Sequence, residues 1–231
     1  ARWAALVVPF AGLWGAIVLR RADVPAVELL RLQAFDQFQR LAPRPYQPVP
    51  IRVVDLDDQT LARLGQWPWP RTQVAQLIQQ LAQLGASAIA FDIVFAEPDR
   101  TSPTHILSVW PATPEFEALR AAAAGLPDHD QVLAEAIHQA SVVTGFGLTN
   151  DPNTRTPLAK SGQAFRGDDP HQYAPPFWGA VTNLEAFERS ARGNGHFNPW
   201  FDRDGLVRRV PLVLRLEQTL YPALAAEAVR V

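Results

Sequence analysis

The sequence contains 231 residues, 48% of them hydrophobic and 19% charged, which is enough to bury an α/β core and excludes a disordered or fibrous chain. The net charge of -2 at pH 7 offers no basic surface to a phosphate backbone, so nucleic acid is not expected as a partner. The absence of cysteine excludes a disulfide scaffold, a thiolate metal site and a cysteine nucleophile, and the absence of methionine indicates that the chain is part of a longer protein.

Residues 1–21 are predicted to form a transmembrane anchor. An uncharged apolar run extends from Trp3 to Leu19, and its 17 residues are near the lower limit for crossing a bilayer. A buried core helix and the apolar part of a cleaved signal peptide are the alternatives. Arg20 and Arg21 follow the run, and the positive-inside rule would place them in the cytoplasm, which argues against an extracytoplasmic position for the rest of the chain.

Residues 22–48 are predicted to form a juxtamembrane helix and a linker. Asp23 and Pro25 suit the start of a helix, and Pro43 suits its end. Between them, apolar residues recur at spacings of three and four and so share one helix face: Val27, Leu30, Ala34, Phe38 and Leu41. This stripe either packs on the chain's own domain or pairs with the same helix of a second copy, which would make the protein a homodimer.

Residues 49–231 are predicted to form one α/β domain that begins with a βαβ unit. The β-rich run 51–58 gives the first strand, and the apolar run 86–95 gives the second. Between them lies a helix with Thr72 as N-cap, Gly85 as C-cap and apolar residues at helical spacing. Because a crossover helix joins parallel strands, the carboxyl ends of both strands meet at one edge of the sheet.

Acidic residues follow both predicted strands at that edge, and a bulky loop with the sequence WPWPR, residues 67–71, enters the helix beside them. Ligands of open α/β sheets usually bind at this edge, so we interpret the loop as a lid over an acidic rim. The candidate ligand-binding residues are Asp55, Asp57, Trp67, Trp69, Arg71, Asp92, Glu97 and Asp99. No catalytic residue, metal ligand or cofactor is assigned.

Two other interpretations of the acidic rim are open. Carboxylates at strand ends suit magnesium or calcium, but the Asp-x-Asp-x-Thr/Val pattern of haloacid-dehalogenase-like phosphatases is absent, because Gln59 occupies its fifth position. The other interpretation is structural. A carboxylate inside an apolar strand is costly unless it is paired, so we expect Asp92 to form a buried ion pair with Arg71.

The second half of the domain alternates helices and strands. Helices are predicted at 114–125 and 129–140, a strand at 141–148, and an irregular excursion at 150–176 that is rich in proline, glycine and polar residues. A turn at 202–205, with a positive φ at Gly205, precedes a long strand at 206–216 and a helix that Pro222 opens. The predicted fold class is α/β: a central, mostly parallel sheet with βαβ units and a C-terminal antiparallel hairpin, preceded by a transmembrane helix and a juxtamembrane helix.

Four blocks of the sequence resemble the second type of CHASE domain (CHASE2), the cyclase and histidine-kinase associated sensory extracellular domain. They occur in the family's order and are VVDLDDQTLARLGQWPWPR, GASAIAFDIVFAEPD, GNGHFNPWFDRDGLVRRVPL and LYPALAAEAVR. The resemblance implies a sensor domain that follows an N-terminal membrane anchor and lies on the outer, periplasmic side of the bacterial cytoplasmic (inner) membrane. It implies an intracellular output: a nucleotide cyclase (adenylate or guanylate) or, alternatively, a histidine kinase, a serine/threonine kinase or a diguanylate cyclase.

We therefore expect residues 49–231 to be the extracytoplasmic sensor of a transmembrane receptor, with a nucleotide cyclase outside this chain as its output. The resemblance implies no particular ligand, so the signal is an unidentified small molecule or protein. The sensor region itself is not expected to be an enzyme. A metal-dependent hydrolase that uses the acidic rim and a purely structural dimerisation module are the competing hypotheses.

Overall fold

The computed structural model describes residues 4–21, 24–153 and 155–231. The chain divides into two compact units, which are described separately below. The smaller unit comprises Ala1–Asp55 together with Phe201–Leu206, and the larger unit comprises Leu56–Trp200 together with Val207–Val231.

The smaller unit begins with helix α1 (Ala4–Arg21). Among the residues that the structure describes, no helix is both long enough and apolar enough to cross a membrane. The predicted transmembrane anchor at 1–21 therefore has no support here, and its first three residues lie outside the described part.

Helix α2 (Pro25–Leu41) confirms the predicted helix in 22–48. Its covered face carries Leu32, which is buried, and Glu28, whose Oε2 lies 2.6 Å from Nε of Arg203. Arg203 belongs to the predicted turn at 202–205, where Gly205 has a φ of +80° as expected and its N–H donates to Asp202 O. The predicted apolar stripe lies on the opposite side of α2 and is exposed, with Phe38 70% accessible.

The predicted strand at 51–58 is wrong. Residues 43–57 form neither helix nor strand, and Val53 is 89% exposed. A β-rich run becomes a strand only where its N–H and C=O groups pair with a neighbouring strand, and this run follows four prolines in the stretch 43–50 that restrict pairing. Asp57 instead caps helix α3 (Asp58–Leu64), because its Oδ1 accepts a hydrogen bond from Thr60 N at 2.8 Å.

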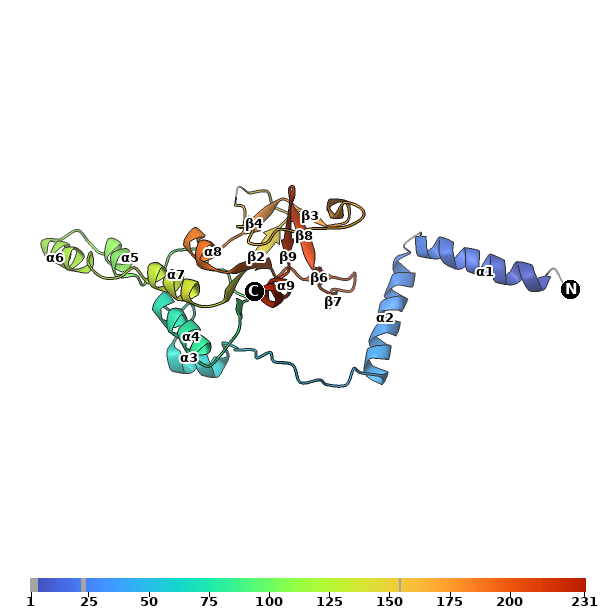
Figure 1. Cartoon of the computed structure of the whole chain (residues 1–231), viewed down its shortest axis with the longest axis horizontal. Coiled ribbons are helices and arrows are strands. Elements are labelled where there is room, and N and C mark those ends of the chain that lie inside the picture. Colours follow the sequence, from blue (N-terminus) through green and yellow to red (C-terminus); the bar gives the residue numbers. More distant parts are fainter. Residues whose placement is uncertain (1–3, 22–23, 154) are drawn as a thin grey trace. The chain divides into compact units, whose positions relative to one another are not determined.

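The larger unit contains the predicted mostly parallel sheet (Figure 1). Strand β2 (Val142–Thr149) lies at its centre and pairs in parallel with β1 (Ile89–Phe91) and with β5 (Gly193–His196). The last residues of β2 pair antiparallel with β4 (Gly179–Val181). The βαβ unit therefore exists, but it consists of β1, the crossover that ends in helix α7 and β2, rather than of 51–58 and 86–95.

A second, smaller sheet contains the predicted C-terminal hairpin. Strands β8 (Val213–Leu216) and β9 (Thr219–Pro222) pair antiparallel, and β3 (Pro176–Phe177) lies parallel to β8. The predicted strand 206–216 is divided into β7 (Val207–Arg209) and β8, because Pro211 has no N–H for a continuous ladder. Strand β7 pairs with β6 (Trp200–Phe201).

The helices of the larger unit include the predicted helices at 114–125 and 129–140. Beyond α3 they are α4 (Arg71–Gln83), α5 (Pro103–Ser108), α6 (Pro114–Ala123), α7 (His129–Gln139), α8 (Glu185–Ser190), α9 (Leu224–Arg230) and the short 3-10 helix η1 (Pro170–Gln172). Helix α9 begins two residues after Pro222, which belongs to β9. Helix α4 ends at Gln83 with Leu84 as its C-cap, so the predicted C-cap, Gly85, lies one residue beyond the cap. The φ of +88° at Gly85 permits the hydrogen bonds Gly85 N to Ala82 O and Ala86 N to Leu81 O.

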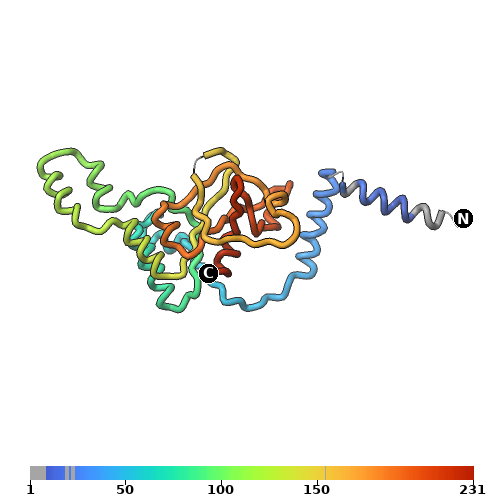
Figure 2. The backbone as a smooth tube through the Cα atoms, turned by 45° about the horizontal axis from the view of Figure 1, so that its top comes forward, coloured from blue at the N-terminus to red at the C-terminus, as the bar shows by residue number. Residues whose placement is uncertain are grey.

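The main core lies between the sheet and the helix pair α4 and α7. Residues four apart on each helix face inward and are almost fully buried against Val142 of β2: Val74 and Ile78 on α4, and Leu133 and Ile137 on α7. The tube in Figure 2 shows that the chain between β2 and β4, coloured yellow to orange, runs along the outside of this unit. This arrangement leaves the carboxyl ends of the parallel strands close to that outer segment.

Candidate functional site

The WPWPR loop forms a compact aromatic corner before α4. Trp69 is buried, and its Nε1 donates to Gly65 O at 2.9 Å. The rings of Trp67 and Trp69 meet edge to face with centroids 5.6 Å apart, and the Trp67–Pro68 peptide bond is cis. Trp67 also packs on the main core. The two indoles therefore pack against each other at one end of the main core.

Arg71, the last residue of this loop, is 7% exposed and connects α4 to the segment after β1. Its backbone N–H donates to Asp99 Oδ2 at 2.7 Å, so the cap of α4 comes from a residue 28 positions along the chain and not from Thr72. Its guanidinium donates to Glu97 O and lies 4.5 Å from the centroid of the Phe95 ring. Each of these contacts fixes the segment 95–99 beside the first turn of α4.

Asp99 and Asp130 complete a polar cluster that we call the Asp99 node: Arg71, Asp99, Thr101, His129 and Asp130. Asp99 Oδ1 accepts from both N and Oγ1 of Thr101 at 2.8 Å, and His129 Nδ1 lies 3.2 Å from Asp99 Oδ2. Asp130 Oδ2 accepts from Asp99 N at 3.0 Å, and its Oδ1 lies 3.6 Å from Arg71 Nε. The node therefore joins the N-terminal ends of α4 and α7 to the loop that follows β1.

The two carboxylates of the node have opposite pKa shifts. Burial alone would raise the pKa of Asp99, but the hydrogen bonds from Arg71, Thr101 and His129 outweigh it and hold the pKa below its usual value. Burial raises the pKa of Asp130, and the hydrogen bond from Asp99 N and the charge of Arg71 only partly offset it. Asp99 is therefore the firmly ionised member that caps α4.

The expected ion pair between Asp92 and Arg71 is wrong. Strand β1 ends at Phe91, so Asp92 lies beyond it and is exposed, and Arg71 pairs with Asp130 instead. Of the predicted rim, the structure brings together Trp67, Trp69, Arg71, Asp99 and the backbone of Glu97. The carboxylate of Asp57 caps α3, and Asp55 belongs to the smaller unit. Among the described residues, no group of three or more His, Cys, Asp or Glu side chains is arranged to hold a metal ion.

A pocket of about 610 Å³ lies beside Ala96, in the chain that follows β1. Its floor carries Glu188 of α8 and Tyr221 of β9. One wall is formed by residues 155–159 of an irregular segment, residues 155–160, that we call the strap. The opposite side is lined by 182–185, where Asn183 accepts from Phe95 N and donates to Gly145 O and so anchors this wall to the chain after β1 and to β2. The predicted irregular excursion at 150–176 is confirmed in its described residues before η1, and it covers this pocket.

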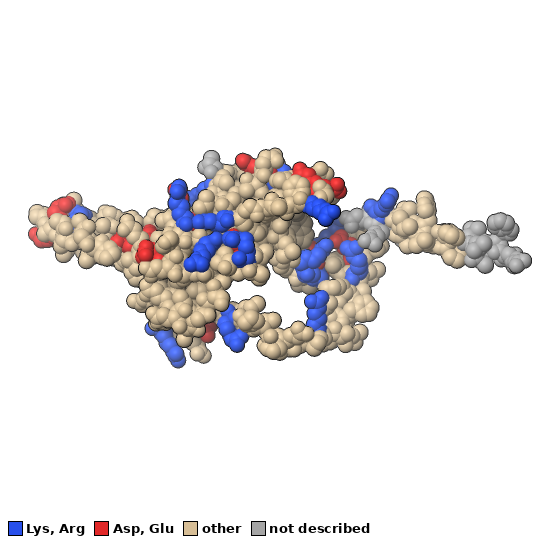
Figure 3. All heavy atoms as spheres, in the orientation of Figure 1, with Lys and Arg blue, Asp and Glu red and all other residues tan. Residues whose placement is uncertain are grey.

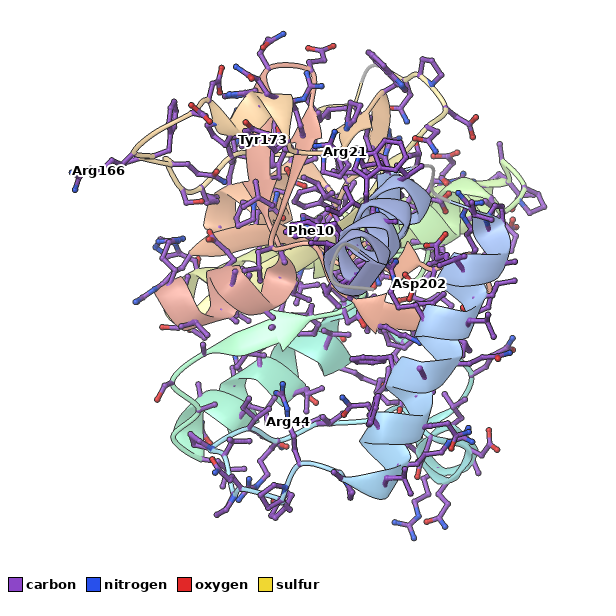
Figure 4. All side chains as sticks on the ribbon, turned by 90° about the vertical axis from the view of Figure 1, so that its right-hand side faces the viewer. Phe10, Arg21, Arg44, Arg166, Tyr173 and Asp202 are labelled. Carbon is purple, nitrogen blue, oxygen red and sulfur yellow. The ribbon has the colours of Figure 1, made fainter. Side chains whose placement is uncertain are left out.

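Buried side chains from three elements hold the strap. Leu158 N donates to Glu188 Oε2 at 2.8 Å, Asn194 Nδ2 donates to Leu158 O at 3.1 Å, and Tyr221 Oη donates to Pro157 O at 2.9 Å. Lys160 Nζ donates to the carbonyl of Arg189. Arg166, which follows the strap, points away from the unit (Figure 4). The strap is therefore fixed at its base by the pocket floor.

Burial raises the pKa of Glu188 and raises the pKa of Tyr221 to about 12. The hydrogen bond from Leu158 N acts in the opposite direction on Glu188 without cancelling the effect of burial. Sequence reasoning missed Glu188, Tyr221 and Asn194, because each is a single polar residue in an unremarkable helix or strand pattern. It also missed Asp130, although the acidic stretch before the predicted helix at 129–140 was a capping signal.

The chain matches the family model described as the CHASE2 domain over residues 7–231. The chain therefore belongs to the CHASE2 family, as the resemblance predicted. CHASE2 domains are extracytoplasmic sensor domains of signalling receptors. Neither the comparison with curated proteins nor that with solved structures gives a match.

Proposed function

We propose that this chain is the extracytoplasmic sensory part of a bacterial receptor held in the cytoplasmic membrane, and that it passes a signal to an intracellular nucleotide cyclase. The observation that carries the proposal is the CHASE2 family match over residues 7–231. The pocket beside Ala96 supports a role in ligand binding, because its volume of about 610 Å³ lies within the roughly 300 to 1,000 Å³ of small-molecule sites.

The receptor works as a homodimer in this proposal. Support comes from the apolar stripe on α2, which is exposed, while the opposite face of the helix carries Leu32 and the Glu28–Arg203 ion pair. An apolar stripe on a helix gains stability only when another surface covers it. In a homodimer, the apolar stripes of the two α2 helices would pack on each other and cover both.

Cysteine labelling tests on which side of the membrane the domain lies. The chain itself contains no cysteine, so an introduced cysteine is the one site of labelling within it. Arg166→Cys, at an exposed and outward-pointing position, is introduced into the full-length receptor, and the unmodified receptor is the control. A membrane-impermeant maleimide should label this variant in intact spheroplasts. Labelling that occurs only after lysis would contradict the extracytoplasmic position.

The output is tested on the same membranes. Formation of cyclic AMP and cyclic GMP is measured beside cyclic di-GMP formation and autophosphorylation, which report the alternative outputs. Cyclic AMP or cyclic GMP should form, and its rate should change when the strap is loosened by Tyr221→Phe, which removes the hydroxyl that donates to Pro157 O. If autophosphorylation is found without a cyclic mononucleotide, the output is a kinase and not a nucleotide cyclase. If cyclic di-GMP is formed without a cyclic mononucleotide, the output is a diguanylate cyclase.

A further inference from the structure

The floor of the pocket contains a carboxylate oxygen whose partner is missing from the described chain. Glu188 is 4% exposed, and its Oε2 accepts from Leu158 N, but within residues 4–21, 24–153 and 155–231 its Oε1 makes no hydrogen bond of normal geometry. The Asn194 side chain and the Asn183 backbone lie close enough to lower the pKa of Glu188 without cancelling the effect of burial. A buried charged oxygen without a partner is costly, so sites of this kind normally receive a donor from outside the chain. Glu188 also lines the pocket, so the donor can come from a bound molecule.

The pocket is large enough for a small organic molecule. Its volume of about 610 Å³ lies within the roughly 300 to 1,000 Å³ of small-molecule sites, and far exceeds the roughly 30 Å³ that one water molecule takes up. The lining combines the apolar groups Ala96 and Leu184 with the hydroxyl groups of Thr182 and Thr219. This mixture suits a molecule with one charged group, a short carbon chain and further hydrogen-bonding groups.

The charges around the pocket favour a cation. Glu188 lies at the floor, and Glu185, which also lines the pocket, is exposed and paired with Arg189. The lining includes one cationic residue, the exposed Arg155 of the strap. Lys160 lies outside the lining, where its Nζ donates to the carbonyl of Arg189, and its charge only partly offsets the effect of burial on the pKa of Glu188. Calcium and magnesium require about six or more oxygen ligands, and no cluster of acidic or histidine side chains among the described residues supplies them. An ammonium group needs only a few acceptors, one of which is Glu188 Oε1.

Basic side chains gather on the surface around α8 and α9, and acidic ones lie on the arm formed by α5 and α6 (Figure 3). This part of the surface therefore carries basic groups, so the preference of the pocket for a cation rests on the residues of its own lining.

We infer that the pocket under the strap binds a small organic ammonium compound, with its protonated nitrogen donating to Glu188 Oε1 and its polar groups contacting the threonine hydroxyls. This inference rests on the proposed sensory function, since it assigns a ligand class to the same domain. The strap contacts the same residue through Leu158 N, so a ligand at Glu188 binds next to the hydrogen bond that fixes the strap. Occupancy of the pocket is thereby coupled to the position of residues 155–160.

The test uses ethanolamine as the probe at millimolar concentration, with ethylene glycol as the uncharged control and sodium chloride to match ionic strength. Binding to the whole chain is measured by calorimetry and by the shift in melting temperature. The variants are Glu188→Gln, which keeps the shape and an oxygen for Leu158 N, and Glu135→Gln, the same change at an exposed carboxylate of α7 that is not part of the pocket lining. Ala96→Phe fills the pocket from the opposite wall and leaves Glu188 unchanged.

Ethanolamine, but not ethylene glycol, should raise the melting temperature of the parent and of Glu135→Gln. Glu188→Gln should weaken binding by about tenfold or more, the usual effect of losing a charged hydrogen-bond partner, and Ala96→Phe should weaken it similarly. Absence of binding to the parent, equal binding to Glu188→Gln, or an equal loss in Glu135→Gln would overturn the inference. If Glu188→Gln does not fold, the Ala96→Phe result decides.

Failure of this inference and failure of the proposed function have different signatures. If ethanolamine does not bind while Arg166→Cys is labelled from outside and a cyclic nucleotide is formed, only the ligand class is wrong. If ethanolamine binds through Glu188 while the label reaches Arg166→Cys only after lysis, the pocket chemistry stands and the sensory topology falls.

Discussion

His196, at the carboxyl end of β5, is fully buried, and neither ring nitrogen has a hydrogen-bond partner among the described residues. Burial lowers its pKa from 6.5 to about 4, because the charged imidazolium loses its hydration. The unfolded chain therefore binds more protons than the folded chain between these two values. The free energy of unfolding is therefore unaffected by His196 protonation above pH 6.5, and it decreases as the pH falls from 6.5 toward about 4.

Replacing His196 by Leu should flatten this part of the stability profile. Leu has a similar volume and no titratable group, so the variant avoids the loss of about 3 kcal/mol that a shift of this size implies. Denaturant unfolding of parent and variant is compared across the range from neutral pH to pH 4, where the titrations of all other groups are common to both proteins. Parallel curves would show that His196 is not the residue responsible.

Arg71 is the second residue whose burial leads to a prediction. Arg71→Ala should cost about 3 kcal/mol, because it removes the cation beside Asp130 and the donor to Glu97 O and leaves a largely buried carboxylate unpaired. The matched control is Asp92→Asn, a change at an exposed carboxylate that should alter stability by no more than about 0.5 kcal/mol. Equal unfolding free energies for the two variants would contradict the structural role of the Asp99 node.

The Arg71 and Asp92 outcomes show where sequence reasoning stops. The sequence identifies Arg71 as a buried cation that needs a carboxylate, because the bulky WPWPR loop precedes an amphipathic helix. It does not identify the partner, because Asp130 is 59 positions away and approaches only through the packing of α7 on α4. The sequence favours Asp92 as the partner of Arg71 because Asp92 lies inside an apolar run. Strand β1 is only three residues long and ends just before Asp92.

At the scale of the element, the sequence predicts helices and strands whose apolar residues recur periodically. It does not predict whether a β-rich run finds a neighbouring strand to pair with. Helices α4 and α7 have inward residues four apart, and β2 is a largely apolar run without charged residues, so their burial pattern is present in the sequence itself. The run 51–58 has the same local character as a strand but no partner, and pairing is a property of two segments. The pocket was not predictable for the same reason, since α8, β9 and the strap are brought together only by the fold.

The contact between α9 and β5 depends on a residue without a side chain. A Cβ at Gly195 would lie 2.7 Å from Cα and 2.8 Å from N of Leu224, in the first turn of α9. These are backbone atoms, which cannot rotate away as a flexible side chain can. Gly195→Ala should therefore displace α9 and cost about 1 to 3 kcal/mol.

The control for this substitution is Gly162→Ala, at a position where a Cβ meets nothing within 4 Å and φ is not positive. Thermal and denaturant unfolding of both variants is measured beside the parent. Gly162→Ala should be close to neutral, since it adds a methyl group in open space. A neutral Gly195→Ala would mean that α9 is not held against β5 in the way that the structure has it.

At the scale of the whole molecule, a sensor must convert an event in its pocket into a change at the membrane. A ligand shifts an equilibrium between two arrangements only if it binds one of them more tightly. The strap provides such a difference within the larger unit, because Glu188 and Tyr221 contact both the pocket and the strap. The exposed stripe of α2 provides a surface through which two copies can adopt more than one arrangement.

The last prediction concerns this stripe. Phe38→Glu places a charge in the centre of the apolar face of α2, opposite Leu32 and the Glu28–Arg203 pair, so it should weaken dimerisation and uncouple output while leaving the larger unit folded. Membrane tethering raises the local concentration of the two helices, so the effect on the isolated chain should be the larger one. Gln33→Glu is the matched control, since it adds the same charge at an exposed position off the stripe.

Sedimentation, melting temperature and the output activity of the full-length receptor are measured on both variants. Loss of the dimer and of output in Phe38→Glu, with an unchanged melting transition and an unaffected Gln33→Glu, is the expected result. An unchanged association state combined with a lower melting temperature would instead mean that the stripe packs on its own chain, because the charge would then disturb folding and not assembly. In that case the signal would have to leave the larger unit through its C-terminal helix α9, which packs on β5 and ends next to Val231.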